Sequence, residues 1–120
     1  MTKKEIAISF LKLAGTGFVQ DAFIKYIDSD LSHHNQYFKG DRESLINAME
    51  NAHRTSPNKA IDIKYCYEDK DTIITHSLVT KEDMEIAVVH IFRFKKERII
   101  ELWDLGQVIS KDSPNENGLF

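Results

Sequence analysis

The sequence predicts an α+β fold in which three helices precede a curved antiparallel sheet. Two observations predict it. In the first half of the 120-residue chain, apolar residues recur at helical spacing, and in the second half they alternate with polar residues. The length suits one domain, so we expect a single domain over residues 1–120. Because helices can cover only one face of such a sheet, an open cavity between the two layers is expected.

Each expected helix has a sequence signal at its start or its end. Thr2 and Glu5 have the spacing of a capping box, and Gly15 ends the first helix. Asp28-Ser29-Asp30 breaks the second helix, and Asp41 is the expected N-cap of the third. In chain order we expect helices at 2–15, 18–27 and 41–56, with a short segment at 31–38 before the third.

The second half of the chain has the pattern of a strand meander. Apolar and polar residues alternate, as in a strand with one buried face. The expected strands are 61–68, 72–80, 85–95 and 99–109. The tail from 110 to 120 is polar except for Leu119 and Phe120, and we expect these two side chains to pack back on the cavity rim or on a partner subunit.

Composition excludes several classes of protein. The net charge of −3 argues against a nucleic-acid partner, which usually selects a basic surface. No apolar run approaches the roughly 18 residues of a membrane span, so no membrane partner is expected. The single cysteine, Cys66, leaves no intrachain disulfide, and we expect a cytoplasmic protein.

The last hairpin decides which chemistry-bearing side chains meet. A two-residue turn at Lys96-Glu97 would place His90 opposite Trp103, whereas a three-residue turn at 96–98 would place His90 opposite Asp104. We prefer the three-residue turn because it matches Phe94 with Ile100 and Arg93 with Glu101.

The preferred register puts His90 and Asp104 together on an otherwise apolar face. Burial raises the pKa of a carboxyl group and a nearby imidazolium lowers it, so such a pair suits proton transfer near neutral pH. A structural hydrogen bond that holds the hairpin is an equally good interpretation. A catalytic Asp104 must face an open cavity with a second polar group in reach, whereas a structural Asp104 would be sealed and fully hydrogen-bonded.

The last hairpin also resembles a known family. Phe92-Arg93-Phe94 followed by Ile99-Ile100-Glu101-Leu102-Trp103-Asp104 is similar to the closing hairpin of the SnoaL-like polyketide cyclases, which have the nuclear transport factor 2-like fold. His34-Asn35, residues 40–43, His76-Ser77 and the ending 113–120 resemble a branch described as predicted aldol-condensation enzymes. In that branch an Asp often stands at the position of His90, so the chain departs from its pattern there.

The resemblance implies a fold, a reaction type and roles for residues. The fold would be a cone of curved antiparallel sheet capped by three helices, dimeric through the sheet. Asp104 would be the acid or base of an aldol-type proton transfer, and His90 would assist it. It implies no cofactor and no metal. The expected partners are a small, mostly apolar carbonyl compound and a second copy of the chain.

Further polar and aromatic residues are candidates for binding the substrate. We expect His34, Asn35 and His76 to hydrogen-bond it, with Tyr65 and Trp103 lining the pocket. Satisfied core histidines and ordinary core aromatics are the alternative interpretation of these residues. The five histidines include no His-x-x-x-His or His-Glu-x-x-His spacing, so we expect no metal ligands.

Two functions therefore remain open. The leading hypothesis is an enzyme that moves a proton next to a carbonyl group in an apolar pocket, for an aldol cyclisation, an isomerisation or a dehydration. The alternative is a non-catalytic module of the same fold that binds a small ligand or forms a dimer scaffold. In either case Ala87, Val89 and Ile91 form an apolar set on the face away from the helices, which a second chain would cover.

Overall fold

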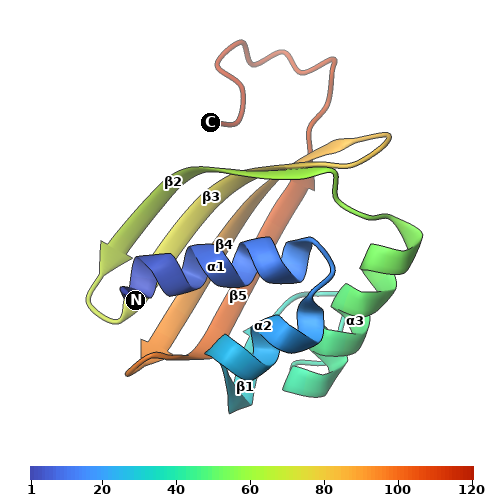
Figure 1. Cartoon of the computed structure of the whole chain (residues 1–120). Helices are drawn as coiled ribbons and strands as arrows, with labels where there is room; N and C mark the ends of the chain where they lie inside the picture. The colour runs from blue at the N-terminus through green and yellow to red at the C-terminus, as the bar shows by residue number, and fades with distance from the viewer.

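The computed structural model describes residues 1–120 as three helices packed on one sheet (Figure 1). The helices are α1 (Lys3–Gly15), α2 (Val19–Tyr26) and α3 (Arg42–Thr55). The strands are β1 (Ile27–His34), β2 (Ala60–Asp69), β3 (Thr72–Thr80), β4 (Glu85–Lys95) and β5 (Arg98–Val108). Their order in the sheet is β1-β5-β4-β3-β2, and β2 to β5 form an antiparallel meander. The predicted α+β fold is confirmed.

The helix signals in the sequence act as expected. The Thr2 hydroxyl accepts a hydrogen bond from the Glu5 backbone nitrogen at 3.1 Å, and the Glu5 carboxylate accepts one from the Thr2 nitrogen at 2.9 Å. Asp41 caps α3 by accepting from the backbone nitrogen of Ser44 at 3.2 Å. These contacts satisfy N–H groups that the first turn of a helix cannot pair internally.

The core lies between the helices and one face of the sheet, which we call the inner face. Figure 1 shows α1 crossing the strands on this side. The Phe10 ring of α1 contacts the Phe23 ring of α2 edge-on at 5.5 Å and the Phe92 ring of β4 at 6.2 Å. Ile73 and Leu102 complete the inner face beside them. The opposite side, which includes His76, Val89 and Trp103, is called the outer face.

One strand was not expected from the sequence. Residues 27–34 form β1, which pairs in parallel with β5 at the sheet edge. The Asp28 carboxylate accepts a hydrogen bond from the backbone nitrogen of Asp30, and pairing with β5 is interrupted between Ile27 and Ser32. Asp28-Ser29-Asp30 therefore does interrupt the regular backbone, as expected. It produces an irregularity inside an edge strand rather than a loop.

The register of the last hairpin is confirmed, but its predicted turn is wrong. His90 lies opposite Asp104 and Arg93 lies opposite Glu101, as expected. The turn itself has two residues, Lys96 and Glu97, and an irregularity beyond it leaves Phe94 opposite Ile99 instead of Ile100. The extra residue of the bulge replaces the extra residue of the longer turn, so both arrangements give the same register from Arg93 onward.

The end of the tail packs back on the domain as predicted, but on the outer face rather than on the rim of a cavity between helices and sheet. The Phe120 ring lies 4.7 Å from the ring of His76 on β3, and Lys64 of β2 lies over its face at 6.0 Å. Leu119 lines a cavity of about 300 Å³ together with His76 and Val89. Figure 1 shows the tail leaving the end of β5 and turning back toward β2 and β3.

None of the three helices combines the length and the apolar character that crossing a lipid bilayer requires.

Candidate active site

The largest cavity opens beside the inner face, where the ends of β4 and β5 meet the segment after β1. Its volume is about 750 Å³, enough for a ligand of ordinary metabolite size. Its polar lining residues are His34, Asn35, Gln36, Tyr37, Asn58, Lys81, His90, Asp104 and Gln107. Its other lining residues are Val79, Ile86, Val88, Leu105, Gly106 and Val108.

The strand register brings His90 and Asp104 together in this cavity. His90 on β4 pairs with Asp104 on β5, and both side chains point into the cavity. His90 Nε2 lies 3.8 Å from Asp104 Oδ1, which is longer than a direct hydrogen bond. The Asp104 side chain is 38% exposed and that of His90 is 17% exposed. The pair is accessible from the cavity, and a ligand oxygen or a water beside it could contact both side chains.

Asn35 supplies the second polar contact of Asp104. It follows the end of β1, and its Nδ2 donates to Asp104 Oδ2 at 3.3 Å. Asn35 Oδ1 in turn accepts from the backbone nitrogen of Tyr37 at 2.8 Å, which fixes the orientation of the amide. Asp104 thus faces an open cavity with a polar neighbour in reach, the condition that distinguishes a catalytic carboxylate from a sealed structural one.

The surroundings of His90 favour its neutral form. Burial lowers the pKa of His90 below its usual value, and the charge of Asp104 only partly opposes this. His90 Nδ1 is buried and has no hydrogen-bond partner. Since an unpaired buried N–H is costlier than an unpaired acceptor, the ring carries its proton on Nε2, which faces Asp104. The imidazole can therefore donate to Asp104 or to an oxygen placed between the two side chains.

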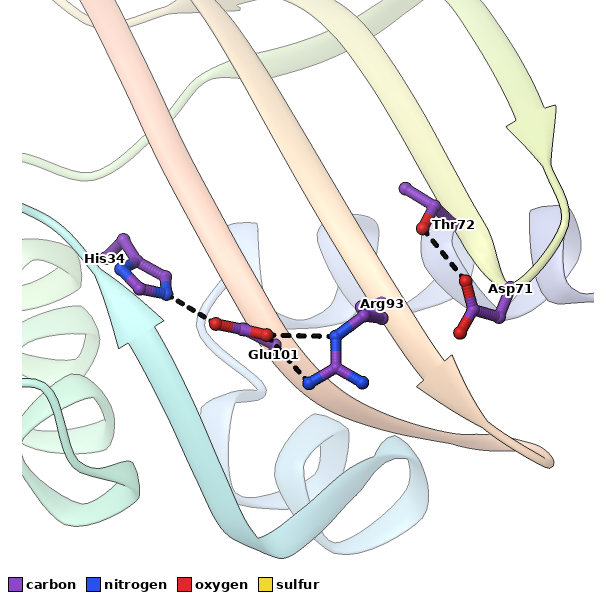
Figure 2. A network of polar contacts seen from close by, with 5 residues as sticks. All are labelled: His34, Asp71, Thr72, Arg93 and Glu101. Carbon is purple, nitrogen blue, oxygen red and sulfur yellow. Dashed lines mark hydrogen bonds and ion pairs between the residues drawn. The ribbon is translucent and has the colours of Figure 1, made fainter.

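His34 lines the cavity, but the residues that hold its ring do not. His34 Nε2 bonds Glu101 Oε2 at 2.7 Å, and its ring stacks on Trp103 at 4.7 Å. Arg93 donates to Glu101 Oε1 through Nε at 2.9 Å and Nη2 at 2.8 Å, so Glu101 joins β1, β5 and β4 (Figure 2). The hydrogen bonds from His34 and from Arg93 hold the pKa of Glu101 below its usual value, and His34 is the larger cause.

Three of the predicted substrate-binding residues lie outside the cavity. They are Tyr65, His76 and Trp103, which lie on the outer face. There the rings of Tyr65 and His76 are 5.7 Å apart, and the ring of Trp103 stacks on that of His34. Their side chains point away from Asp104 because they occupy the alternate positions of their strands. Of the predicted binding residues, the structure brings Asn35 and His34 to the cavity that holds His90 and Asp104.

The cavity also has five polar lining residues that were not predicted as site residues, namely Gln36, Tyr37, Asn58, Lys81 and Gln107. Of these, Lys81 comes directly after β3 and Asn58 follows α3, so both reach the cavity from outside the last hairpin. No motif marks either of them, because their meeting depends on where α3 ends relative to the β3–β4 connection. His33, by contrast, is buried, and its Nε2 bonds the Lys39 carbonyl oxygen at 2.6 Å, which is a structural role.

No three His, Cys, Asp or Glu side chains lie close enough to hold a metal ion together, so we assign no metal ligands. Cys66 is half-buried against the core, and burial raises the pKa of its thiol. A thiol with a raised pKa is a weak nucleophile, and Cys66 does not line the cavity.

Comparison with known proteins identifies the fold of this chain. Neither a protein-family model nor a curated protein sequence matches the chain. Solved structures do match. An NTF2-like protein of unknown function from Cytophaga hutchinsonii is 14% identical, with 89% of this chain and 91% of that one covered at a TM-score of 0.73.

Two other solved structures similar to this chain are described as enzymes. A presumed polyketide cyclase from Acidithiobacillus ferrooxidans is 18% identical, with coverages of 88% and 89% and a TM-score of 0.72. An LEH-like epoxide hydrolase from M. tuberculosis is 14% identical, with coverages of 88% and 82% and a TM-score of 0.69. At such identities the likeness shows the fold alone, and the chain has the nuclear transport factor 2-like fold that the sequence predicted.

Proposed function

We propose that this protein is a small-molecule enzyme of the SnoaL-like type that transfers a proton next to a carbonyl group. The observation that carries the proposal is the loosely held pair of His90 and Asp104 in an open cavity of about 750 Å³. Asp104 would take the proton from the carbon next to the carbonyl. The Nε2–H of His90 and the amide of Asn35 would donate hydrogen bonds to the carboxylate or to the developing enolate oxygen.

The geometry suits this step in two ways. The 3.8 Å separation leaves the carboxylate free to accept a proton, since His90 does not occupy it with a short hydrogen bond. Val88 stands next to the pair and Ile86 lies farther along the same cavity wall, and an apolar wall favours the neutral carbon acid over water. Cyclisation, isomerisation and dehydration all begin with this proton transfer, and the similar enzymes described as a cyclase and an epoxide hydrolase share the fold.

The test is proton exchange in deuterated water. Simple methyl ketones are incubated with the protein, and deuterium uptake at the carbon next to the carbonyl is followed by NMR. Asp104→Asn should slow the exchange roughly 10²–10⁴-fold, the usual contribution of a positioned base, while the protein stays folded. Asp112→Asn, on the exposed tail, is the matched control and should exchange at the parent rate.

The same assay distinguishes the enzyme from the non-catalytic alternative. A ligand-binding module or dimer scaffold would bind the ketones without exchanging them faster than buffer. Equal exchange rates for the parent and Asp104→Asn would show that Asp104 is not the base.

A further inference from the structure

Lys81 is the only lysine or arginine that lines the cavity, and the proposed proton transfer does not use it. It follows β3 at the start of the connection to β4, and its backbone nitrogen donates to the Met84 carbonyl oxygen at 2.9 Å. This turn holds the residue at the cavity end far from the catalytic pair. Its side chain lies near the end of α3, where its ammonium group donates to the carbonyl oxygen of Ser56.

The cavity thus has two polar ends separated by an apolar wall. His90 and Asp104 form one end, and Lys81 forms the other. Ile86, which lines the wall near Lys81, precedes His90 by four residues of β4, or about 13 Å of extended strand. Val88 lies between them on the same face. A ligand that reaches both ends has an apolar middle and two polar ends.

The charge of Lys81 has no partner of opposite sign. Lys59 pairs with Glu82 and Lys64 with Asp62, whereas Lys81 makes no ion pair. Its only acceptor is the neutral carbonyl of Ser56, although an ammonium group has three donors. A half-buried cation that makes no ion pair is stabilised by an anion that binds to it.

The pKa of Lys81 agrees with this geometry. Burial lowers the pKa of its ammonium group below the usual value, and the charge of Asp83 opposes the change. An anionic group bound in the cavity would stabilise the charged form by pairing with it.

We propose that Lys81 anchors a carboxylate at the end of the ligand opposite its reactive carbonyl, so that the substrates are keto acids with an apolar middle. A single carboxylate matches the single cation at this end. A phosphate carries more charge and needs several donors, which one ammonium beside an apolar wall does not supply. The assignment of a reactive carbonyl rests on the proposed function, whereas the anchoring of the carboxylate does not.

The test compares 9-oxodecanoate with its methyl ester, in which a neutral ester group replaces the charged carboxylate. Affinities are measured by calorimetry on the parent and on Lys81→Met, which keeps most of the side-chain length and removes the charge. The parent should bind the acid at least about tenfold more tightly than the ester, as expected for a charge-assisted contact. Lys81→Met should bind the two equally, and Lys81→Arg should recover most of the preference.

Lys59→Met is the matched control, because Lys59 is a paired lysine that does not line the cavity. It should keep the preference of the parent. Equal binding of acid and ester by the parent would overturn the inference, and this measurement needs no variant to fold. Absence of measurable binding of the acid to the parent would overturn it as well, as would an unchanged preference in a folded Lys81→Met.

The deuterium assay separates the two proposals. If the acid preference depends on Lys81 but no ketone exchanges, the anchor stands and the proposed reaction fails. If ketones exchange through Asp104 and the preference is absent, the reaction stands and the anchor fails. Asp104→Asn should keep the preference for the acid in either case.

Discussion

The molecule contains two imidazole–carboxylate pairs, one on each face of the same sheet, and they are built in opposite ways. On the outer side, His34 and Glu101 are 2.7 Å apart, and Arg93 adds two further hydrogen bonds to the carboxylate. On the inner side, His90 and Asp104 are 3.8 Å apart, and His90 Nδ1 has no partner. The outer pair is complete without a ligand, and the inner pair is not.

The difference between the two pairs distinguishes a structural polar group from one that is available to a ligand. A fully hydrogen-bonded network contributes most by holding elements together, and Glu101 joins three strands. A cavity group with spare hydrogen-bonding capacity is stabilised by what it binds. An imidazole and a carboxylate therefore serve architecture on one face and, as we propose, chemistry on the other.

The largest expected difference between the pairs is in proton-transfer activity. In the exchange assay Asp104→Asn should lose roughly 10²–10⁴-fold, because it removes the base. Glu101→Gln should lose less than about tenfold, because Glu101 acts only through His34 and β1. If Glu101→Gln loses as much as Asp104→Asn in folded protein, the division of roles between the faces is wrong.

The outer face should also form a dimer. Val89 and Ile91 pair with Leu105 and Trp103 on this side, and Leu105 is 58% exposed. We expect light scattering at micromolar concentration to give twice the chain mass of 13.9 kDa. Leu105→Lys should give the monomer mass, because it places a charge in the apolar contact.

Ile24→Lys is the control for this experiment, since Ile24 is an exposed apolar residue of α2 away from the sheet. It should leave the mass unchanged. A monomeric parent would remove the role in association that we assign to the outer face.

The outer network should matter more for stability than the inner pair. Glu101→Ala leaves the Arg93 side chain and His34 without their acceptor, so the free energy of unfolding should fall by about 1 kcal/mol. His90→Gln should lower it by less, since it breaks no short hydrogen bond. Urea unfolding of both variants at neutral pH measures the difference, and the reverse order would contradict the comparison.

The smallest expected effect is a pH dependence of stability that comes from His90. Its pKa is lowered in the folded protein from an ordinary value of 6.5, so the unfolded chain takes up the proton first as the pH falls. Above about pH 6.5 the neutral His90 costs the fold no stability. As the pH falls from there toward the lower, folded pKa, the free energy of unfolding falls by at most about 1.4 kcal/mol per pH unit.

The measurement is urea unfolding of the parent and of His90→Gln between about pH 7 and about pH 5. The variant should lose less stability over this range. The difference between the two curves isolates His90, because Asp104, His34 and the other titratable groups of the cavity are common to both. Parallel curves would mean that the pKa of His90 is not lowered by folding.

Local chemistry determined much of this protein from its sequence. The capping box of Thr2 and Glu5 and the N-cap of Asp41 are contacts within one turn, so they could be predicted directly. The pairing of His90 with Asp104 was also predictable, because matching Arg93 to Glu101 sets the register of neighbouring strands. The choice between a two-residue turn with a bulge and a three-residue turn was not, since both give the same register.

Only the tertiary structure decided which residues share the cavity. β1 was missed because an edge strand needs few apolar residues, and its partner β5 lies far away in sequence. Tyr65, His76 and Trp103 went to the outer face because the alternation along a strand separates neighbours but does not say which side the helices cover. Lys81 reached the cavity through the packing of α3 beside the β3–β4 connection, a contact between distant segments that no local pattern encodes.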